Sequence, residues 1–294
     1  MGLDYESVRK IKPDIVYVSS SALGQTGPVA KNRFFGTQLA SFAGFTGLTG
    51  WPDRPPIGLS GAYSDPVAAR FTTALIVGAL DRRRRTGQGC YIDLSQVEVA
   101  LQLLTPLFLG YQANGTIPGR AGNRSPYAAP HGVFPCEGDD RWIAIAVSTP
   151  AEWESLCRVM ERPALAGDPR FATILARKHH EEDLEQIVGQ WTRERQAEDL
   201  MERLQAAGVP AGVVENYEDL FNDPQLKHRG HFVYLEHTTI GKHAYDGTPV
   251  HLSASPAQPF PAPCLGEHTE RVMKDILKYG DDEIATLVAE GALE

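Results

Sequence analysis

Cysteine is scarce in this sequence, and long apolar runs are absent from it. The four cysteines, Cys90, Cys136, Cys157 and Cys264, are far apart and include no CxxC pair. Their spacing predicts neither a disulfide framework nor a zinc site, and it favours reduced thiols. No stretch approaches the roughly 18 apolar residues that a membrane span needs, and the amino-terminal residues lack an apolar signal core. We therefore expect a cytoplasmic protein that makes no membrane contact.

Positive charge is also in short supply. The 294 residues include 28 lysines and arginines against 37 aspartates and glutamates, which gives a net charge of −9. Nucleic-acid binding favours a basic surface, so we expect no nucleic-acid partner. The one basic run, Arg82 to Arg85, lies where a helix is expected to end, and there it would offset the helix dipole. Anion binding by this run is the alternative.

Histidines are present, but they do not form a metal motif. Five of them, His228, His231, His237, His243 and His251, are scattered through a stretch that is otherwise rich in loop residues. No pair has the i, i+4 spacing of a helical zinc site, and no cluster of carboxylates accompanies them. We therefore expect no metal.

The apolar patterns that are present predict an α/β protein. Residues 15–19 and 90–94 read as buried parallel strands, residues 66–85 as a helix that stops at Gly87, and residues 97–111 as a helix interrupted by Pro106. Between them, residues 34–50 contain Gly36, Gly44, Gly47 and Gly50, which allow a backbone to approach a helix or a ligand closely.

A second region follows a stretch rich in Gly, Arg, Asn and Pro at residues 115–132. Strands are expected at 133–134, 142–147 and 211–214, and helices at 151–160, 181–191 and 197–207. This pattern predicts a small α+β domain. From residue 223 onward we expect loops, closed by a terminal helix over residues 267–277.

Asp65 is the residue with the strongest chemical signal. It stands directly before Pro66, at the start of the predicted long helix, where an aspartate is an ordinary N-cap. The helix dipole would also favour the ionised carboxylate there, which suits a nucleophile. The two roles are compatible. Upstream, the small residues 20–28 follow a strand, which is where open α/β sheets bind ligands.

A series of short motifs resembles the family III CoA-transferases, also called the CaiB/BaiF family, in order along nearly the whole chain. The motifs are Pro13-x-Ile-Val-Tyr, Gly24-Gln-Thr-Gly-Pro28, Gly44-Phe-Thr-Gly-Leu-Thr-Gly50, Asp65, Arg84-Arg-Thr-Gly-Gln-Gly89, Ile92-Asp-Leu-Ser-Gln96, His131-Gly-Val-Phe-Pro135, Asp168-Pro-Arg-Phe171, Gly208-Val-Pro-Ala211, Asp223-Pro-Gln-Leu226 and Leu265-Gly-Glu-His268. Each motif alone is weak, but their co-occurrence is specific.

The resemblance implies an enzyme that moves CoA between carboxylic acids through a covalent intermediate on Asp65, the match to the family's catalytic aspartate. Small residues beside it, Gly61, Ala62 and Ser64, would let the thioester approach. The cofactor-binding residues implied for CoA or acyl-CoA, which are substrates here, are Gly24, Gln25, Arg33 and Phe35. For Arg33 and Phe35 the alternatives are a surface arginine and a packed phenylalanine.

Two other functions stay open. The family includes α-methylacyl-CoA racemases, which pair the aspartate with a histidine on the preceding segment. Residues 31–38 contain no histidine, and none occurs before His131, so a transferase is favoured. A non-catalytic or partner-dependent subunit is the other alternative. Where the best-known members have a glycine-rich loop, this chain has residues 125–131, so their substrates do not carry over.

The fold that the resemblance implies is an open Rossmann-like parallel sheet, incomplete at the amino terminus, plus a smaller α+β domain. Residues 1–114 would be the remainder of the large CoA domain, 115–222 the small domain with its preceding linker, and 223–294 a linker and a return to the large domain. An incomplete sheet exposes an edge that needs a partner. A truncated reading frame, a fragment and a split enzyme with a partner chain are the open explanations, and an interlocked homodimer is the family's usual assembly.

Overall fold

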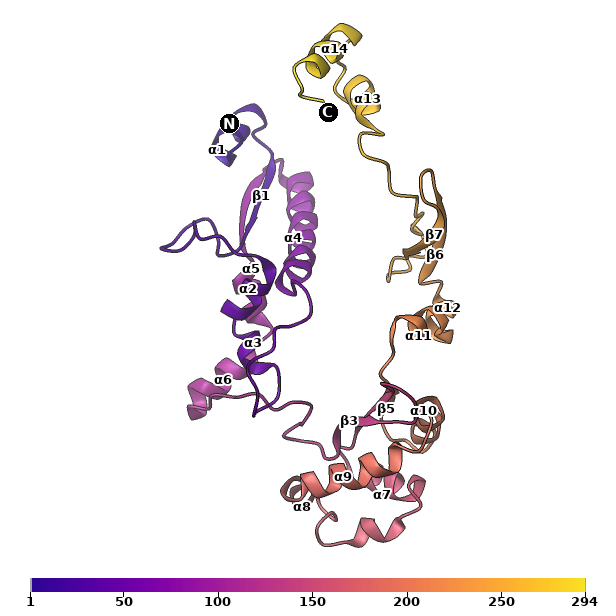
Figure 1. Cartoon of the computed structure of the whole chain (residues 1–294). Helices are drawn as coiled ribbons and strands as arrows, with labels where there is room; N and C mark the ends of the chain where they lie inside the picture. Colours follow the sequence, from indigo (N-terminus) through magenta and orange to yellow (C-terminus); the bar gives the residue numbers. More distant parts are fainter. Residues whose placement is uncertain (1, 294) are drawn as a thin grey trace. The chain divides into compact units, whose positions relative to one another are not determined.

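The computed structural model describes residues 2–293, which form two compact units, one up to Gly212 and one from Val213 onward. The first unit contains α1 (Tyr5–Ile11), β1 (Val16–Ser21), α2 (Gly36–Phe42), α3 (Phe45–Leu48), α4 (Ser64–Thr86), β2 (Cys90–Ser95), α5 (Gln96–Gln102), α6 (Thr105–Asn114), β3 (His131–Pro135), β4 (Trp142–Ala146), α7 (Pro150–Val159), η1 (Pro163–Gly167), α8 (Ile174–His179), α9 (Glu181–Thr192) and α10 (Ala197–Ala206), with β5 (Ala211–Val213) at the boundary (Figure 1). The three predicted domain boundaries stay a prediction.

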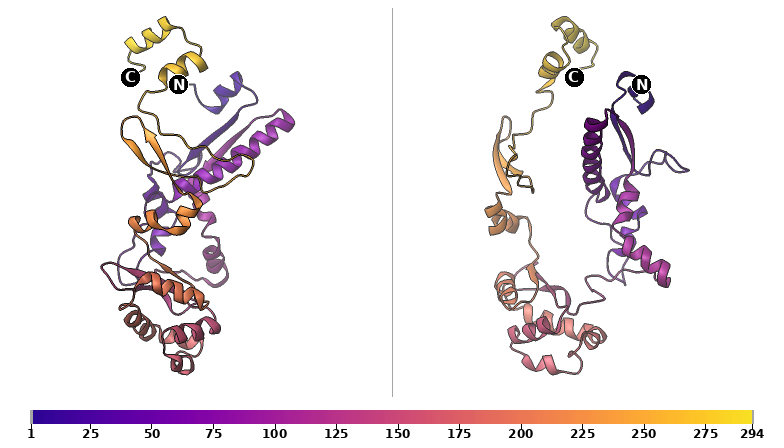
Figure 2. Two further views of the ribbon diagram at one scale, coloured as in Figure 1. Left: turned by 90° about the vertical axis from the view of Figure 1, so that its right-hand side faces the viewer. Right: turned by 180° about the vertical axis from the view of Figure 1, so that it is seen from behind.

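A parallel pair of strands carries the first half of this unit. β1 and β2 pair in register from Val16 opposite Cys90 to Ser21 opposite Ser95. α4 lies against the pair, as the views of Figures 1 and 2 agree. α4 ends at Thr86 and β2 begins at Cys90, so the helix runs antiparallel to the strands. The first turn of α4 therefore lies toward the carboxyl ends of both strands.

The prediction that Asp65 is an N-cap is wrong. α4 begins at Ser64, so Asp65 is its second residue, and Tyr63 occupies the cap position without a side-chain cap. The backbone already turns before Asp65, because the Asp65 amide donates to the carbonyl of Ala62 at 2.9 Å. The predicted stop is confirmed, since Gly87 has a left-handed φ of 72° and its amide donates to Arg83.

The predicted helix over 97–111 is two helices. Ser95 caps α5, and its hydroxyl accepts from the amide of Glu98 at 3.4 Å. Pro106 is the second residue of α6, a position where its missing N–H leaves no hydrogen bond unmade. The proline therefore lies in the first turn of the second helix.

The small α+β part has a three-stranded sheet in the order β3, β4, β5, with β3 and β4 antiparallel. Its core contains many of the most completely buried side chains of the described residues. β4 buries every second residue, and the amphipathic helices α7, α9 and α10 each bury one face. The fully buried side chains include Ile143, Ile145, Trp153, Leu156, Phe171, Leu184, Val188, Leu200 and Leu204. The predicted small α+β region is confirmed as a set of elements.

The second unit is more regular than the sequence predicts. It contains α11 (Tyr217–Asn222), α12 (Pro224–Arg229), β6 (Phe232–His237), β7 (Gly241–Asp246), α13 (Thr269–Arg271), η2 (Val272–Ile276) and α14 (Asp281–Ala289). The expectation of loops from residue 223 is therefore wrong for α12 and for the β6–β7 hairpin. The predicted terminal helix over 267–277 is present as α13 and the π-helical η2 that follows it directly, but it does not close the chain, because α14 comes after it. Both strands of the hairpin are only partly buried.

Among residues 2–293, no helix is both long enough and apolar enough to cross a membrane.

Candidate active site

Asp65 lies at the carboxyl edge of the β1–β2 pair with its side chain exposed to solvent. Within the part of the chain that the structure describes, its carboxylate takes part in no hydrogen bond and no ion pair. The carboxylate is thus available to a ligand.

Gly36, the first residue of α2, approaches Asp65 closely. A Cβ atom on Gly36 would lie 2.6 Å from Oδ2 of Asp65, 2.2 Å from Cβ of Ala62 and 2.8 Å from the Ala62 Cα. No side chain fits at these distances, so only glycine lets α2 reach the start of α4. The interpretation that the glycines of residues 34–50 serve close approach is confirmed at this position.

Ser64 joins the same two helices from inside. It is 1% exposed, and its hydroxyl donates to the carbonyl of Gly36 at 3.4 Å. Ser64 therefore positions α2 against α4 and does not open space for a ligand. Gly61 has a left-handed φ of 73°, a conformation that a residue with a side chain would adopt at this position only with strain.

Gly24 and Gln25 lie in the loop that follows β1. The amide of Gln25 donates to both carboxylate oxygens of Asp93, each at 3.1 Å, and Gly24 has a φ of 83°. Asp93 stands near the end of β2, so it holds the loop at the carboxyl edge of the strands. The role of Asp93 was missed, although it belongs to the motif at residues 92–96, and its signal is an acidic residue at a strand end.

Arg33 and Phe35 lie on the segment that leads into α2. Both side chains are exposed, Phe35 by 80%, and the backbone amide of Phe35 donates to Oε1 of Gln38 at 3.0 Å. The alternative of a packed Phe35 is therefore wrong. A contact of either residue with CoA stays a prediction, and so does that of Gly24 and Gln25.

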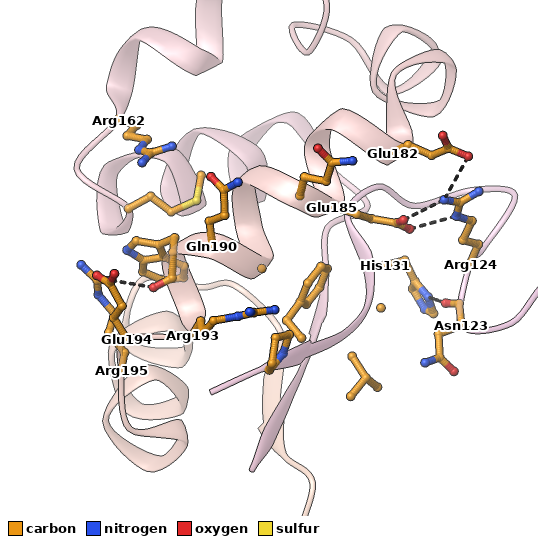
Figure 3. A pocket seen from close by; sticks show the side chains of 18 of the residues that line it. Asn123, Arg124, His131, Arg162, Glu182, Glu185, Gln190, Arg193, Glu194 and Arg195 are labelled. Atoms are coloured by element: carbon orange, nitrogen blue, oxygen red, sulfur yellow. Dashed lines mark hydrogen bonds and ion pairs between the residues drawn. The ribbon is translucent and has the colours of Figure 1, made fainter. Parts of the chain in front are cut away.

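A separate cavity of about 1010 Å³ opens in the small α+β part, between the start of β3 and the carboxyl end of α9 (Figure 3). Its lining is rich in charged and polar side chains, and Asp65 is not among them. The labelled residues are Asn123, Arg124, His131, Arg162, Glu182, Glu185, Gln190, Arg193, Glu194 and Arg195. Sequence reasoning missed this cavity, because its residues come from segments that are distant in the chain.

At one side of the cavity an arginine is paired with glutamates. Arg124 makes a two-pronged contact with Glu185, Nε to Oε1 at 2.9 Å and Nη2 to Oε2 at 2.7 Å. Glu182 lies 3.9 Å from the same guanidinium. The hydrogen bond to Glu185 raises the pKa of Arg124 above its ordinary value.

His131 lies beside this pair at the start of β3. Its Nδ1 is 2.6 Å from the carbonyl oxygen of Asn123, and a carbonyl only accepts, so Nδ1 carries the proton. In the neutral ring Nε2 then remains as an acceptor. Across the described residues, no group of three or more His, Cys, Asp or Glu side chains has a geometry that could hold a metal ion.

Comparison with known proteins places this arrangement in a family. The model of CoA-transferase family III matches residues 1–269. Succinyl-CoA–D-citramalate CoA-transferase of Chloroflexus aurantiacus is 32% identical over 98% of this chain and 72% of its own length. Human succinyl-CoA:glutarate CoA-transferase is 26% identical over the full chain and 67% of its own length. A crystal structure of a CAIB/BAIF family protein from Brucella suis superimposes with a TM-score of 0.84 at 30% identity, covering 93% of this chain and 71% of that one.

The fold is thus the mixed α/β fold of the CaiB/BaiF proteins, with a parallel strand pair and antiparallel sheets. The chain belongs to CoA-transferase family III. It is an enzyme of the class that transfers CoA between an acyl-CoA and a carboxylic acid, as the resemblance implied.

Proposed function

We propose that this enzyme transfers CoA between dicarboxylic acids through covalent intermediates on Asp65. The substrate class follows from the relatives, whose names pair succinyl-CoA with citramalate or glutarate. The observation that carries the proposal is the Asp65 carboxylate, which is exposed in the first turn of a 23-residue helix and has no partner among residues 2–293.

The first half of the reaction loads CoA onto Asp65. An oxygen of the carboxylate attacks the thioester carbonyl of the donor, CoA thiolate leaves, and a mixed anhydride of Asp65 and the donor acid forms. The thiolate then attacks the aspartyl carbonyl, which releases the donor acid and leaves an aspartyl–CoA thioester. Covalent catalysis keeps the free energy of the thioester on the enzyme, where water would otherwise dissipate it.

The second half reverses these steps with the acceptor. The acceptor carboxylate attacks the aspartyl carbonyl, CoA thiolate leaves, and a second mixed anhydride forms. The thiolate attacks the acceptor carbonyl, and the new acyl-CoA departs as the Asp65 carboxylate is regenerated. Each step takes place at or beside the Asp65 carboxylate, and the absence of a side chain on Gly36 lets α2 pack against the start of α4 without displacing that carboxylate.

CoA itself would lie along the same edge. We assign Arg33 and Phe35, exposed on the segment before α2, and Gly24 and Gln25, held by Asp93, to its binding. Arginine is suited to phosphate oxygens, and an exposed aromatic ring to stacking. Arg33→Ala is then expected to weaken CoA binding while the fold stays intact.

The assembly and compartment complete the proposal. We assign the chain to a homodimer, or to a complex with a partner chain that supplies further strands, because β1 and β2 pair only with each other among the described residues. We place it in the cytoplasm, where its four free thiols would stay reduced.

The test is intact-mass spectrometry after incubation with succinyl-CoA, with and without hydroxylamine, which cleaves activated aspartyl esters. We expect a CoA-sized or succinyl adduct that maps to Asp65 and disappears with hydroxylamine. Asp65→Ala should lose the adduct and all measurable transfer. Its stability should fall by less than about 1 kcal/mol, because the side chain is exposed and is not the cap.

The matched control is Asp81→Ala, which removes another exposed carboxylate from the same helix, one paired with Arg85. This variant should keep the adduct and the activity. Transfer that persists in Asp65→Ala would refute the mechanism. Exchange of the proton next to the thioester without acyl exchange would indicate the racemase alternative, and an inert wild-type chain would favour a partner-dependent subunit.

A further inference from the structure

The cavity of Figure 3 has a surplus of positive charge at one end. Arg162, Arg193 and Arg195 gather there, and Glu194 is the one carboxylate that lines the same end. Glu182 and Glu185 lie at the other end, where Arg124 is their cationic partner. In a chain of net charge −9, such a local excess of cations is not a property of the surface as a whole.

Arg195 has a structural role. Its Nη1 donates to the carbonyl of Trp191, and its guanidinium lies 5.3 Å from the centre of the Trp191 ring. A cation at the carboxyl end of a helix is favourable because it offsets the helix dipole. The fold therefore accounts for Arg195 without a ligand.

Arg162 and Arg193 have no such role. Neither guanidinium makes a hydrogen bond, ion pair or ring contact with any residue from 2 to 293. The two arginines come from separate segments, Arg162 after α7 and Arg193 after α9. Figure 3 shows the Arg193 side chain extended toward the middle of the cavity, with Gln190 and Arg162 above it in this view. The guanidinium groups of Arg162 and Arg193 and the amide of Gln190 thus line the same cavity without hydrogen bonds to one another.

We propose that this cavity binds the oxyanion of a small molecule, a carboxylate or a phosphate, through Arg162 and Arg193. The planar guanidinium fork matches both groups with two parallel hydrogen bonds, and Gln190 offers a further amide donor. A volume of about 1010 Å³ is at the upper end of the range for small-molecule sites. The site lies apart from Asp65, so it goes beyond the proposed chemistry.

Two molecules of the proposed reaction carry such groups. One is the dicarboxylic acid, whose distal carboxylate takes no part in the transfer, and the other is CoA with its phosphates. Succinate and inorganic pyrophosphate are simple probes of the two. Trp51 and Trp191 line the cavity, so tryptophan fluorescence reports directly on its occupancy.

The experiment titrates the whole protein with succinate, pyrophosphate and sodium chloride at matched ionic strength, by fluorescence and by calorimetry. We expect saturable binding of succinate or pyrophosphate, weakened at least tenfold in Arg193→Ala and in Arg162→Ala. Whichever probe binds identifies the source of the oxyanion. Arg271→Ala removes the same charge at an exposed position of α13 and should bind as wild type.

Asp65→Ala should also bind as wild type, so failure of this site and failure of the aspartyl mechanism are distinguishable. Circular dichroism and thermal unfolding of each variant verify that it folds, as expected for exposed side chains. The proposal is overturned if chloride produces the same response as the probes, if neither probe binds, or if Arg193→Ala and Arg162→Ala bind with wild-type affinity.

Discussion

At the scale of the residue, the contact between Gly36 and Asp65 makes the sharpest prediction. In Gly36→Ala the new Cβ would meet Oδ2 of Asp65 at 2.6 Å and Cβ of Ala62 at 2.2 Å, so α2 and the start of α4 must separate. We expect a loss of about 1 to 3 kcal/mol of stability, typical of overpacking. CoA transfer should fall by at least tenfold, because a displacement of about an ångström at a nucleophile is costly.

The control for this variant is Gly47→Ala in α3, where a Cβ would have no atom within 4 Å. Transfer rates and urea unfolding curves of the two variants give the comparison. Equal activity of Gly36→Ala and wild type would show that α2 does not position the carboxylate.

The four cysteines differ in burial: two are buried and two are partly exposed. Burial raises the pKa of Cys136 to about 11 and that of Cys157 to about 12, and these side chains are 5% and 0% exposed. Cys90 and Cys264 are partly exposed. Because the thiolate is the reactive form, iodoacetamide at pH 8 should modify Cys90 and Cys264 within the folded protein and spare the other two.

Peptide mapping before and after denaturation checks this prediction. The raised pKa values also set the sign of a stability change. Above the ordinary value of 9.0, the unfolded chain ionises these thiols while the folded chain retains their protons, so stability falls as the pH rises from 9 toward 11. Rapid modification of Cys157 in the native state would contradict its burial.

At the scale of the element, α7 depends on a capping box. The Thr149 hydroxyl accepts from the amide of Glu152 at 3.2 Å, and Oε2 of Glu152 accepts from the amides of Ser148 and Thr149 at 2.7 and 3.0 Å. Burial favours the neutral carboxyl, but these hydrogen bonds outweigh it and hold the pKa of Glu152 below its ordinary value of 4.5.

Glu152→Ala should therefore cost about 1 kcal/mol at pH 7. A lowered pKa means that the stabilisation is present above pH 4.5 and is lost as the pH falls through the folded-state value, so the difference from wild type should shrink in acid. Glu152→Gln is the matched control, because an amide oxygen can still accept without titrating. Urea unfolding at several pH values measures the effect, and a difference that does not change with pH would rule out the ionised cap.

Elements with a strong apolar period were predictable, and those without one were not. α4 was expected over 66–85 and spans Ser64–Thr86, because its apolar run and Gly87 mark it clearly. The β6–β7 hairpin was not predicted, although β6 begins with the β-favouring run Phe232-Val-Tyr-Leu235. This run does not alternate, and the scattered histidines around it, His231 before the hairpin and His237 and His243 within it, favoured the interpretation as loop. The helix start was misplaced because Pro66 was taken as the first helical position, whereas the backbone already turns at Ala62, whose carbonyl accepts from the Asp65 amide.

The same limit applies to the candidate sites. Asp65 was identified from the sequence because its position before Pro66 and the surrounding motifs are local features of the chain. The cavity around Arg193 was not, because Arg162, Gln190 and His131 line one cavity only once β3, α9 and the segment after α7 are packed. A site assembled from distant segments leaves no local spacing to read.

At the scale of the whole molecule, part of the apolar surface of α4 is left uncovered by the rest of the chain. The side of the helix with Ile76 and Leu80 is half-buried, whereas Phe71, Leu75 and Val77 are 42%, 45% and 61% exposed. A helix that is apolar on all sides is normally buried on all sides. In addition, a sheet of two strands is marginal by itself. We therefore expect another polypeptide to cover α4, a second copy of this chain being the first expectation.

Light scattering coupled to size-exclusion chromatography tests this expectation, together with a variant that introduces one charge on the apolar face of α4. Wild type should elute with a mass of at least twice 32.2 kDa, and Leu75→Glu should shift it toward the monomer, because a buried unpaired carboxylate opposes association. Leu175→Glu is the control, since Leu175 is 80% exposed on α8 and stands alone as an exposed leucine on that helix. Wild type that runs as a monomer and needs a second polypeptide for CoA transfer would indicate a split enzyme. A monomer that is fully active alone would show that the apolar face of α4 needs no cover.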